Sequence, residues 1–271
     1  MSKFLEVAID IAHEAGALLE HHFLDRVRFE LKGENDLVTV ADRASEKLIV
    51  ERLTAHFADH NIMAEEGGGS EKGSPYRWYV DPLDGTTNFA HGYPQYNVTL
   101  ALERGGEMIA GVVYRPHVNE LFAAELGSGA YLNGRRIHVS KTPVLNESLV
   151  CTGFPVRFRN VSVNIHFYHH MALTTHGVRR SGSAAIDLSD VACGRLESFW
   201  EFGLSPWDLA AGKILITEAG GTITDMKGDP HTMASGTIAG SNGLIHAEML
   251  KEFAEVFAGK SRFPMPAMGG E

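Results

Sequence analysis

The sequence predicts an α/β protein built as two halves, one rich in β-hairpins and one in which strands and helices alternate. Three patterns predict this fold class. Residues 4–22 carry apolar side chains at steps of three and four, as an amphipathic helix does. Asn133 and Gly134 form a hairpin signal between two apolar stretches. After about Pro143 the rhythm changes, and alternation of short apolar runs with helical patterns favours a largely parallel sheet.

The first half is expected to begin with two helices. The first covers residues 4–22, and Thr39 with Asp42 has the spacing of a capping box that opens a second helix, which runs to about Phe57. Residues 76–81 are aromatic and β-branched, which predicts a strand. The stretch between these elements, residues 65–75, is rich in glycine and polar residues and is expected to be a loop.

Consecutive hairpins are expected in the rest of this half. The segments "YNVTLALE" and "MIAGVVYRP" read as two strands, and "RGGE" between them supplies the glycine that a tight turn requires. The segments "ELFAAE" and "AYLNGRRIHV" continue the strands.

In the second half of the chain, strands and helices are expected to alternate. Strands are predicted at 148–155, 177–179, 196–203 and 237–241, and helices at 162–175, 184–194, 205–219 and 244–258. Gly220 and Gly221 end the third of these helices. We therefore divide the chain into residues 1–143 and 144–271, two halves of one compact unit.

Composition excludes several classes of protein. The net charge of −10 repels nucleic acid and anionic membranes, so we expect neither as a partner. No run approaches the roughly 18 apolar residues of a transmembrane helix. Only two cysteines are present, which favours a reducing compartment, and we expect a cytoplasmic protein. Two histidine pairs, His21-His22 and His169-His170, are expected on solvated helix faces, and we assign no zinc to them.

The motif "VDPLDGTTNF" (residues 80–89) places two carboxylates at the end of a strand. Pro82 ends the ladder and turns the chain, so Asp84 comes round to the side of Asp81. Gly85 permits a tight backbone, and a helical turn after it would present N–H groups to an anion. Two carboxylates beside an anion site make electrostatic sense with cations between them. For the motif in isolation, an ordinary Asp-Pro turn followed by a helix cap is the competing interpretation.

Further acids strengthen the cation hypothesis. Glu65 closes an apolar segment before three glycines and is preferred over Glu66, although a solvated acidic loop has the same letters. Ser205 and Asp208 have the spacing of a helix cap, and small residues behind them indicate a closely packed helix start. Asp208 is then either a capping acid or a metal-bound one. Glu201, at the end of an aromatic strand, is poorly explained by packing.

Together these segments resemble the inositol monophosphatase family of magnesium-dependent, lithium-sensitive sugar-phosphate phosphatases. The stretches "WYVDPLDGTTNFAHGYP" and "SPWDLAAGKILITEAGG" resemble the two signatures of that family. "GENDLVTVADRASE", "MAEEGG", "RSGSAAIDLSDVACGR" and "WEFG" resemble other family segments in the expected order, and the resemblance covers roughly residues 5–258. It implies a layered αβαβα sandwich of the inositol monophosphatase and fructose-bisphosphatase type, and a homodimer.

The resemblance also implies a site with two or three Mg²⁺ ions. The first ion would be held by Glu65, Asp81 and the carbonyl of Leu83, the second by Asp81, Asp84 and Asp208, and a third, weaker ion would lie near Glu65 through water. Catalysis would involve Asp42, Glu65 and Thr86, with Asp42 and Thr86 orienting the attacking water. The substrate would be bound by the following residues: Gly85, Thr86, Gly182, Ser183, Ala184, Glu201 and Asp208.

The function expected from the resemblance is Mg²⁺-dependent hydrolysis of myo-inositol monophosphate or a similar polyol or sugar phosphate. Fructose-1,6-bisphosphatase activity, or activity on another small phosphate ester, is the alternative within the superfamily. A non-catalytic regulatory protein that binds metal or sugar phosphate is the alternative from another class. That alternative predicts the loss of a carboxylate or of Thr86, and the sequence retains them all.

Overall fold

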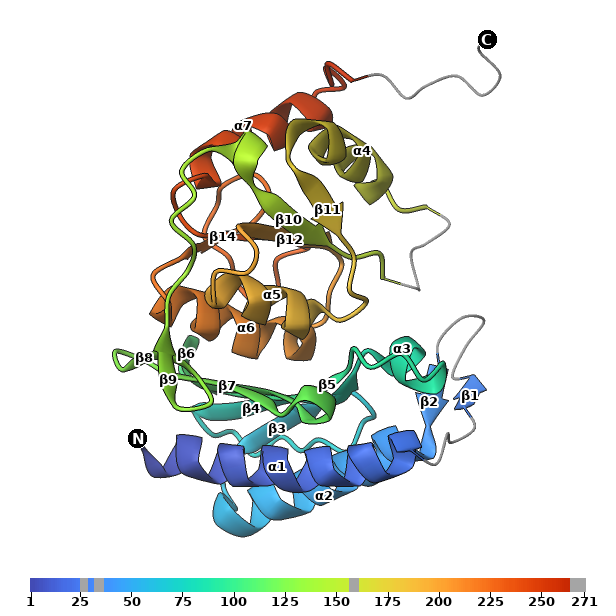
Figure 1. The fold of residues 1–271 in the computed structure, drawn as a ribbon. Helices are drawn as coiled ribbons and strands as arrows, with labels where there is room; N and C mark the ends of the chain where they lie inside the picture. The colour runs from blue at the N-terminus through green and yellow to red at the C-terminus, as the bar shows by residue number, and fades with distance from the viewer. Residues whose placement is uncertain (25–28, 32–36, 156–160, 264–271) are drawn as a thin grey trace.

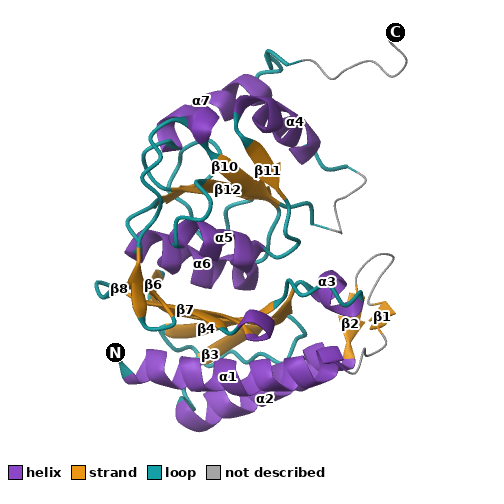
Figure 2. Ribbon diagram, in the orientation of Figure 1, coloured by secondary structure: helices purple, strands orange, loops and turns teal. Residues whose placement is uncertain are grey.

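The computed structural model describes residues 1–24, 29–31, 37–155 and 161–263 of the chain. Its helices and strands stack in five layers, helix, sheet, helix, sheet, helix, which confirms the αβαβα fold (Figures 1 and 2). None of the helices described combines the length and the apolarity needed to cross a bilayer.

The first sheet has seven strands in the order β3-β4-β5-β6-β7-β8-β9. β3 is parallel to β4, and each later neighbour is antiparallel, as the hairpin signals predict. One face of the sheet is covered by α1 (Lys3–Leu24) and α2 (Val40–His56) (Figure 1). The strands are β3 (Asn61–Ala64), β4 (Tyr76–Asp84), β5 (Asn97–Arg104), β6 (Glu107–Arg115), β7 (Glu120–Glu125), β8 (Gly129–Leu132) and β9 (Arg135–Ile137).

The second sheet has five strands in the order β11-β10-β12-β14-β13. Its outer face packs against α4 (Asn164–Thr174) and α7 (His246–Phe257), and α5 (Ala184–Ala192) and α6 (Pro206–Glu218) lie between the two sheets (Figure 1). The strands are β10 (Leu149–Thr152), β11 (Gly177–Arg179), β12 (Ser198–Phe202), β13 (Thr222–Thr224) and β14 (Thr237–Ser241).

The second sheet is mixed, so the prediction of a largely parallel sheet was wrong. β10 runs parallel to β11 and β12, but β14 is antiparallel to both β12 and β13. The cause is β13, a strand of three residues that the sequence pattern did not reveal. It follows α6 directly after Gly220 and Gly221 and runs in the same direction as β12 at the edge of the sheet, so β14 returns antiparallel between the two.

Short elements connect these layers. They are β1 (Phe29–Leu31), β2 (Leu37–Thr39), α3 (Thr86–Ala90) and the single turns Pro116–Val118 and Leu145–Glu147. β1 and β2 form a two-stranded antiparallel ribbon, and α3 follows β4 at the edge of the first half (Figure 1).

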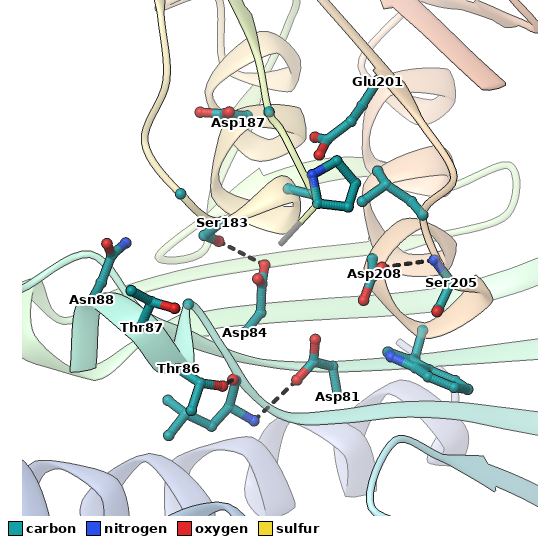
Figure 3. Close-up of a pocket in the computed structure, with 18 of the residues that line it drawn as sticks. Asp81, Asp84, Thr86, Thr87, Asn88, Ser183, Asp187, Glu201, Ser205 and Asp208 are labelled. Atoms are coloured by element: carbon teal, nitrogen blue, oxygen red, sulfur yellow. Dashed lines mark hydrogen bonds between the residues drawn. The ribbon is translucent and has the colours of Figure 1, made fainter. Parts of the chain in front are cut away.

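The middle helices hold the two sheets together. Alanine and leucine side chains of α5 and α6 form one buried cluster with Tyr79, Ala101 and Phe122 of the first sheet and with Phe199 of the second. Small residues let the two helices approach, since a Cβ atom at Gly212 would lie 2.4 Å from a methyl carbon of Leu188. This packing brings the N-terminal ends of α5 and α6 close to the carboxyl end of β4 (Figure 3).

Candidate active site

A cavity of about 350 Å³ lies where the carboxyl end of β4 meets α3 and the N-terminal ends of α5 and α6 (Figure 3). Five separate segments of the chain contribute site residues predicted from the sequence to its wall. These residues are Glu65, Asp81, Leu83, Asp84, Gly85, Thr86, Gly182, Ser183, Ala184, Glu201 and Asp208. Asp42, the remaining predicted residue, lies behind Thr86 and reaches the cavity through it.

β4 turns its two carboxylates toward the cavity by an irregularity in its pairing. Asp81 is opposite Thr99 on β5, and after a register shift Asp84 is opposite Asn97. The expected turn at Pro82 is therefore a bulge within a longer strand. The carboxylate of Asp81 accepts a hydrogen bond from the backbone N–H of Leu83 at 3.1 Å, which fixes its orientation (Figure 3).

The cavity concentrates negative charge. Burial raises the pKa of Asp81 well above its usual range, and the neighbouring carboxylates of Glu65, Asp84 and Asp208 raise it further. Burial also raises the pKa of Asp84, against the effect of its hydrogen-bond donors. Among the described lining residues, Arg180 is the one basic side chain, and six are acidic: Glu65, Asp81, Asp84, Asp187, Glu201 and Asp208.

Gly85 and Thr86 begin a helical turn at the cavity wall. Gly85 has φ of +89°, and a Cβ atom there would lie 2.6 Å from the carbonyl oxygen of Gln95, so only glycine fits. The hydroxyl of Thr86 lies 3.0 Å from the carbonyl oxygen of Leu83 and 3.1 Å from Asp42 Oδ1. Because the hydroxyl has a single proton, it donates to one of these oxygens at a time.

Asp42 combines a structural role with its contact to Thr86. Its Oδ2 atom accepts hydrogen bonds from the backbone N–H of Thr39 at 2.7 Å and from the Thr39 hydroxyl at 2.6 Å, which completes the predicted capping box of α2. Burial raises the pKa of Asp42, and the Thr39 donors oppose that rise. The cap thus fixes one carboxylate oxygen and leaves Oδ1 directed at Thr86.

Asp84 is held by donors from the other half of the chain. The Ser183 hydroxyl donates to Asp84 Oδ2 at 2.6 Å (Figure 3). The backbone N–H of Ala185 donates to the same oxygen at 2.9 Å. Ser183 caps α5 as well, because its Oγ accepts from the N–H of Ile186. The Ser183 hydroxyl proton is therefore committed to Asp84, and the hydroxyl has none to offer a substrate.

Asp208 and Glu201 form the opposite wall. The carboxylate of Asp208 accepts from the N–H of Ser205 at 2.7 Å, so Asp208 is the capping acid of α6 and a cavity residue at once. Glu201 is buried, and this burial raises the pKa of its carboxyl group well above the usual range. The nearby acids Asp187 and Asp208 raise that pKa further. Its carboxylate packs on the backbone of Gly153, where a Cβ atom would lie 2.3 Å from it.

Sequence reasoning missed three residues at or near the site. Asp187 and Arg180 line the cavity, and Asn97 donates to Asp84 Oδ2 at 3.2 Å from the adjacent strand. The one usable signal was Asn97, a polar residue that opens an otherwise apolar strand next to the aspartate motif. Asp187 lies in the first turn of α5, where an acidic residue is favoured by the helix dipole. From the sequence alone it therefore could not be told apart from an acid that only stabilises the helix.

The donor atoms of the cavity fit a hard divalent cation. Carboxylate and carbonyl oxygens are the ligands that Mg²⁺ takes, and their mutual repulsion at Asp81 is what a bound cation would relieve. Among the described residues, three ligand atoms all within 4.8 Å of one another occur elsewhere, at His170, Glu252 and Glu255.

The His170 group corrects the expectation of a solvated histidine pair. His170 is buried because α4 packs on α7, and its ring bonds Glu252 and Ser261. Arg262 bonds the carboxylates of Glu252 and Glu255, so a guanidinium already balances their charge.

Comparisons with known proteins agree on one family. The model of the inositol monophosphatase family matches residues 1–258. The chain is 42% identical over 255 residues to "Putative Nus factor SuhB" of Neisseria meningitidis serogroup B, covering 93% of this chain and 98% of that one. It is 43% identical over 257 residues to "Inositol-1-monophosphatase" of Synechocystis, covering 94% of this chain and 90% of that one.

A bifunctional relative and a solved structure extend the similarity. The chain is 38% identical over 261 residues to "Fructose-1,6-bisphosphatase/inositol-1-monophosphatase" of Aquifex aeolicus, covering 94% of this chain and 98% of that one. The Thermotoga maritima IMPase structure superposes with a TM-score of 0.87 at 40% identity, covering 96% of this chain and 100% of that one.

Proposed function

Since the chain belongs to the inositol monophosphatase family, we propose that it is a Mg²⁺-dependent phosphatase whose substrate is myo-inositol monophosphate or a similar polyol monophosphate. One observation carries the proposal. Glu65, Asp81, Asp84 and Asp208, which are far apart in the sequence, line one cavity beside the backbone of Gly85 and Thr86.

The metal ligands proposed are those expected from the resemblance. Glu65, Asp81 and the Leu83 carbonyl would hold one ion, and Asp81, Asp84 and Asp208 a second, with a weaker third near Glu65. When bound, Mg²⁺ would acidify a water molecule and balance charge on the departing oxygen.

The chain's own groups would position the substrate and water. The N–H groups of Gly85 and Thr86 would bind the phosphate, and the Thr86 hydroxyl, held by Asp42, would orient the attacking water. Glu201 and the backbone of Gly182 and Ala184 would face the hydroxyls of the polyol. Ser183 joins that set through its backbone, because its hydroxyl already bonds Asp84.

Fructose 1,6-bisphosphate is a second candidate substrate, favoured by the bifunctional name of the Aquifex relative. The charges of the cavity make fructose 1,6-bisphosphate a less favoured substrate than a polyol monophosphate. Asp187 and Glu201 are buried acids in the wall away from Gly85, and Arg180 is the one described cation that would face a second phosphate there. A neutral polyol meets no such repulsion.

A regulatory function is the candidate from another class. It is favoured by the similarity to the Neisseria protein named a putative Nus factor. The retained carboxylates and Thr86 favour catalysis instead, since a binding module has no need of a complete hydrolytic site.

Phosphate release tests the proposal. Purified protein is stripped with EDTA and assayed on myo-inositol 1-phosphate, fructose 1,6-bisphosphate and a panel of sugar phosphates, with and without Mg²⁺. We expect Mg²⁺-dependent turnover, with the inositol ester preferred. Absence of turnover on the whole panel would reject the phosphatase and favour the regulatory candidate.

We also propose that the protein is a cytoplasmic homodimer. Within each chain, we propose that the division between the two α/β halves lies between residues 143 and 144. Sedimentation equilibrium tests the dimer, fractionation of cells tests the location, and separate expression of the two halves tests the division.

A further inference from the structure

Asn97, the first residue of β5, uses every hydrogen-bonding group of its side-chain amide. The residue is fully buried. Its Nδ2 atom donates to Asp84 Oδ2 at 3.2 Å and to Ser183 Oγ at 2.8 Å, and its Oδ1 atom accepts from the Thr99 hydroxyl at 2.7 Å. The amide orientation follows from these partners, because a carboxylate accepts only and would repel Oδ1.

Three donors therefore converge on one oxygen of Asp84. They come from Asn97 on β5, and from the Ser183 hydroxyl and the Ala185 N–H at the start of α5. Hydrogen bonds to a charged acceptor are the strong ones, and three on one oxygen fix the rotation of the carboxylate about its last bond. The other oxygen, Oδ1, is thereby set on the opposite side of the group.

Asn97 also determines the direction of the Ser183 proton. Ser183 Oγ accepts from Asn97 and from the N–H of Ile186, so both acceptor positions of the hydroxyl are filled. Its single proton is then left for Asp84. Loss of Asn97 would remove one donor from Asp84 directly and would free the Ser183 hydroxyl to rotate away from it.

We infer that Asn97 is a positioning residue for the metal site: by bonding both Asp84 and Ser183, it fixes Asp84 in the orientation that binds the cation. The inference rests on the proposed function, in which Asp84 is a ligand. Residues that orient metal ligands in this way commonly change metal affinity by about 10- to 100-fold when replaced.

The test is direct cation binding by substrate-free protein. Mn²⁺ is titrated into EDTA-stripped wild type and Asn97→Leu, a variant of similar size without donors, and free Mn²⁺ is measured by electron paramagnetic resonance. We expect the variant to bind Mn²⁺ about 10- to 100-fold more weakly. If Asn97→Leu does not fold, Asn97→Ala is titrated instead. A dissociation constant within twofold of wild type would overturn the inference.

A matched control separates positioning from stability. Asn242 is also buried and also donates two hydrogen bonds, to Ser140 Oγ and the Thr142 carbonyl, but it does not line the cavity. Asn242→Leu should lower the melting temperature and leave Mn²⁺ affinity unchanged. If Asn242→Leu weakens Mn²⁺ binding as much as Asn97→Leu does, the effect of Asn97 is general destabilisation and the inference is rejected.

A double-mutant cycle shows whether Asn97 acts through Asp84. In the Asp84→Asn background, adding Asn97→Leu should change Mn²⁺ affinity less than twofold, because the group it positions has been altered. If Asn97→Leu weakens Mn²⁺ binding in that background as much as it does in wild type, Asn97 does not act through Asp84. The readout also separates the two proposals, since wild type that binds Mn²⁺ but releases no phosphate would reject the phosphatase and leave the role of Asn97 measurable.

Discussion

Replacing Gly212 by alanine tests the packing of the middle layer, which carries Ser183 and Asp208 into the cavity. A Cβ atom at Gly212 would lie 2.4 Å from Leu188 Cδ1 and 2.5 Å from Leu188 Cβ. The Cβ of Leu188 is fixed by its backbone, and the side chain is fully buried, so rotation alone does not relieve the overlap. The two helices have to move apart.

Two opposing terms set the size of the effect. Alanine is favoured over glycine inside a helix by about 0.8–1.0 kcal/mol. Overpacking a close-packed interior costs about 1–3 kcal/mol, and a contact that includes a Cβ atom belongs to the upper part of that range. The overpacking term wins, so we expect a net loss of about 2 kcal/mol and a fall in melting temperature of about 4–8 °C for a domain of this size.

Differential scanning calorimetry measures this fall, and Gly236→Ala is the matched control. A Cβ atom at Gly236 meets no atom within 4 Å, so its melting temperature should stay within about 2 °C of wild type. A Gly212→Ala protein as stable as wild type would refute the close approach of α5 and α6.

Three further predictions concern two acids of the cavity and one buried histidine. Asp84→Asn should lower kcat by more than about 100-fold with an unchanged circular dichroism spectrum, since it would remove the charge of a proposed metal ligand, and an unchanged kcat would remove Asp84 from the mechanism. Glu201→Ala should change the preference among phosphate esters by about tenfold, because it would remove the hydrogen bonds that we propose between Glu201 and the polyol; equal losses on every ester would contradict that role. Burial lowers the pKa of His231 from 6.5 to about 4, so its ring stays neutral in the folded protein and takes up a proton on unfolding. Stability is then complete above about pH 6.5 and falls toward pH 4, by up to about 2 kcal/mol at pH 5. Urea unfolding at pH 7.5 and pH 5 should show a smaller difference for His231→Phe than for wild type, and equal differences would exclude His231.

The sequence predicted elements that have strong local signals. The helix at residues 4–22, the capping boxes at Thr39 and Ser205, and the glycine turn between β5 and β6 depend on neighbouring residues, and the structure has each of them. β13 has three residues, too few for a period to be recognised, and its pairing with β14 is set by the sheet. The direction of that pairing made the second sheet mixed.

The carboxylates of the site that lie within recognisable sequence motifs could be predicted from the sequence. Asp187 could not, because its place in the cavity depends on how α5 packs and not on its neighbours in sequence. Asn97 had a signal as a polar residue at a strand start, but its partner Ser183 is set by the contact of α5 with β5. The same limit applied to His170, whose burial depends on Glu252 across the α4–α7 contact. Tertiary contacts decide such cases, and a pattern read along one segment does not contain them.

The structure also changes how the aspartates of the site should be interpreted. For Asp208 the sequence posed a choice between a capping acid and a metal ligand, yet its carboxylate accepts the N–H of Ser205 while the residue lines the cavity. Asp81 accepts the N–H of Leu83, and Asp84 that of Ala185.

In each of these aspartates one oxygen is bound to the backbone, which restricts the rotation of the carboxylate before any cation arrives. A backbone N–H is a donor that no substitution elsewhere in the chain removes, so this part of the restraint on each carboxylate is built into the fold, and for Asp84 the side chains of Asn97 and Ser183 add to it. Binding a cation then costs less ordering of the side chains than it would for freely rotating acids. A helix cap or strand bulge would therefore be part of what makes these aspartates able to bind a cation.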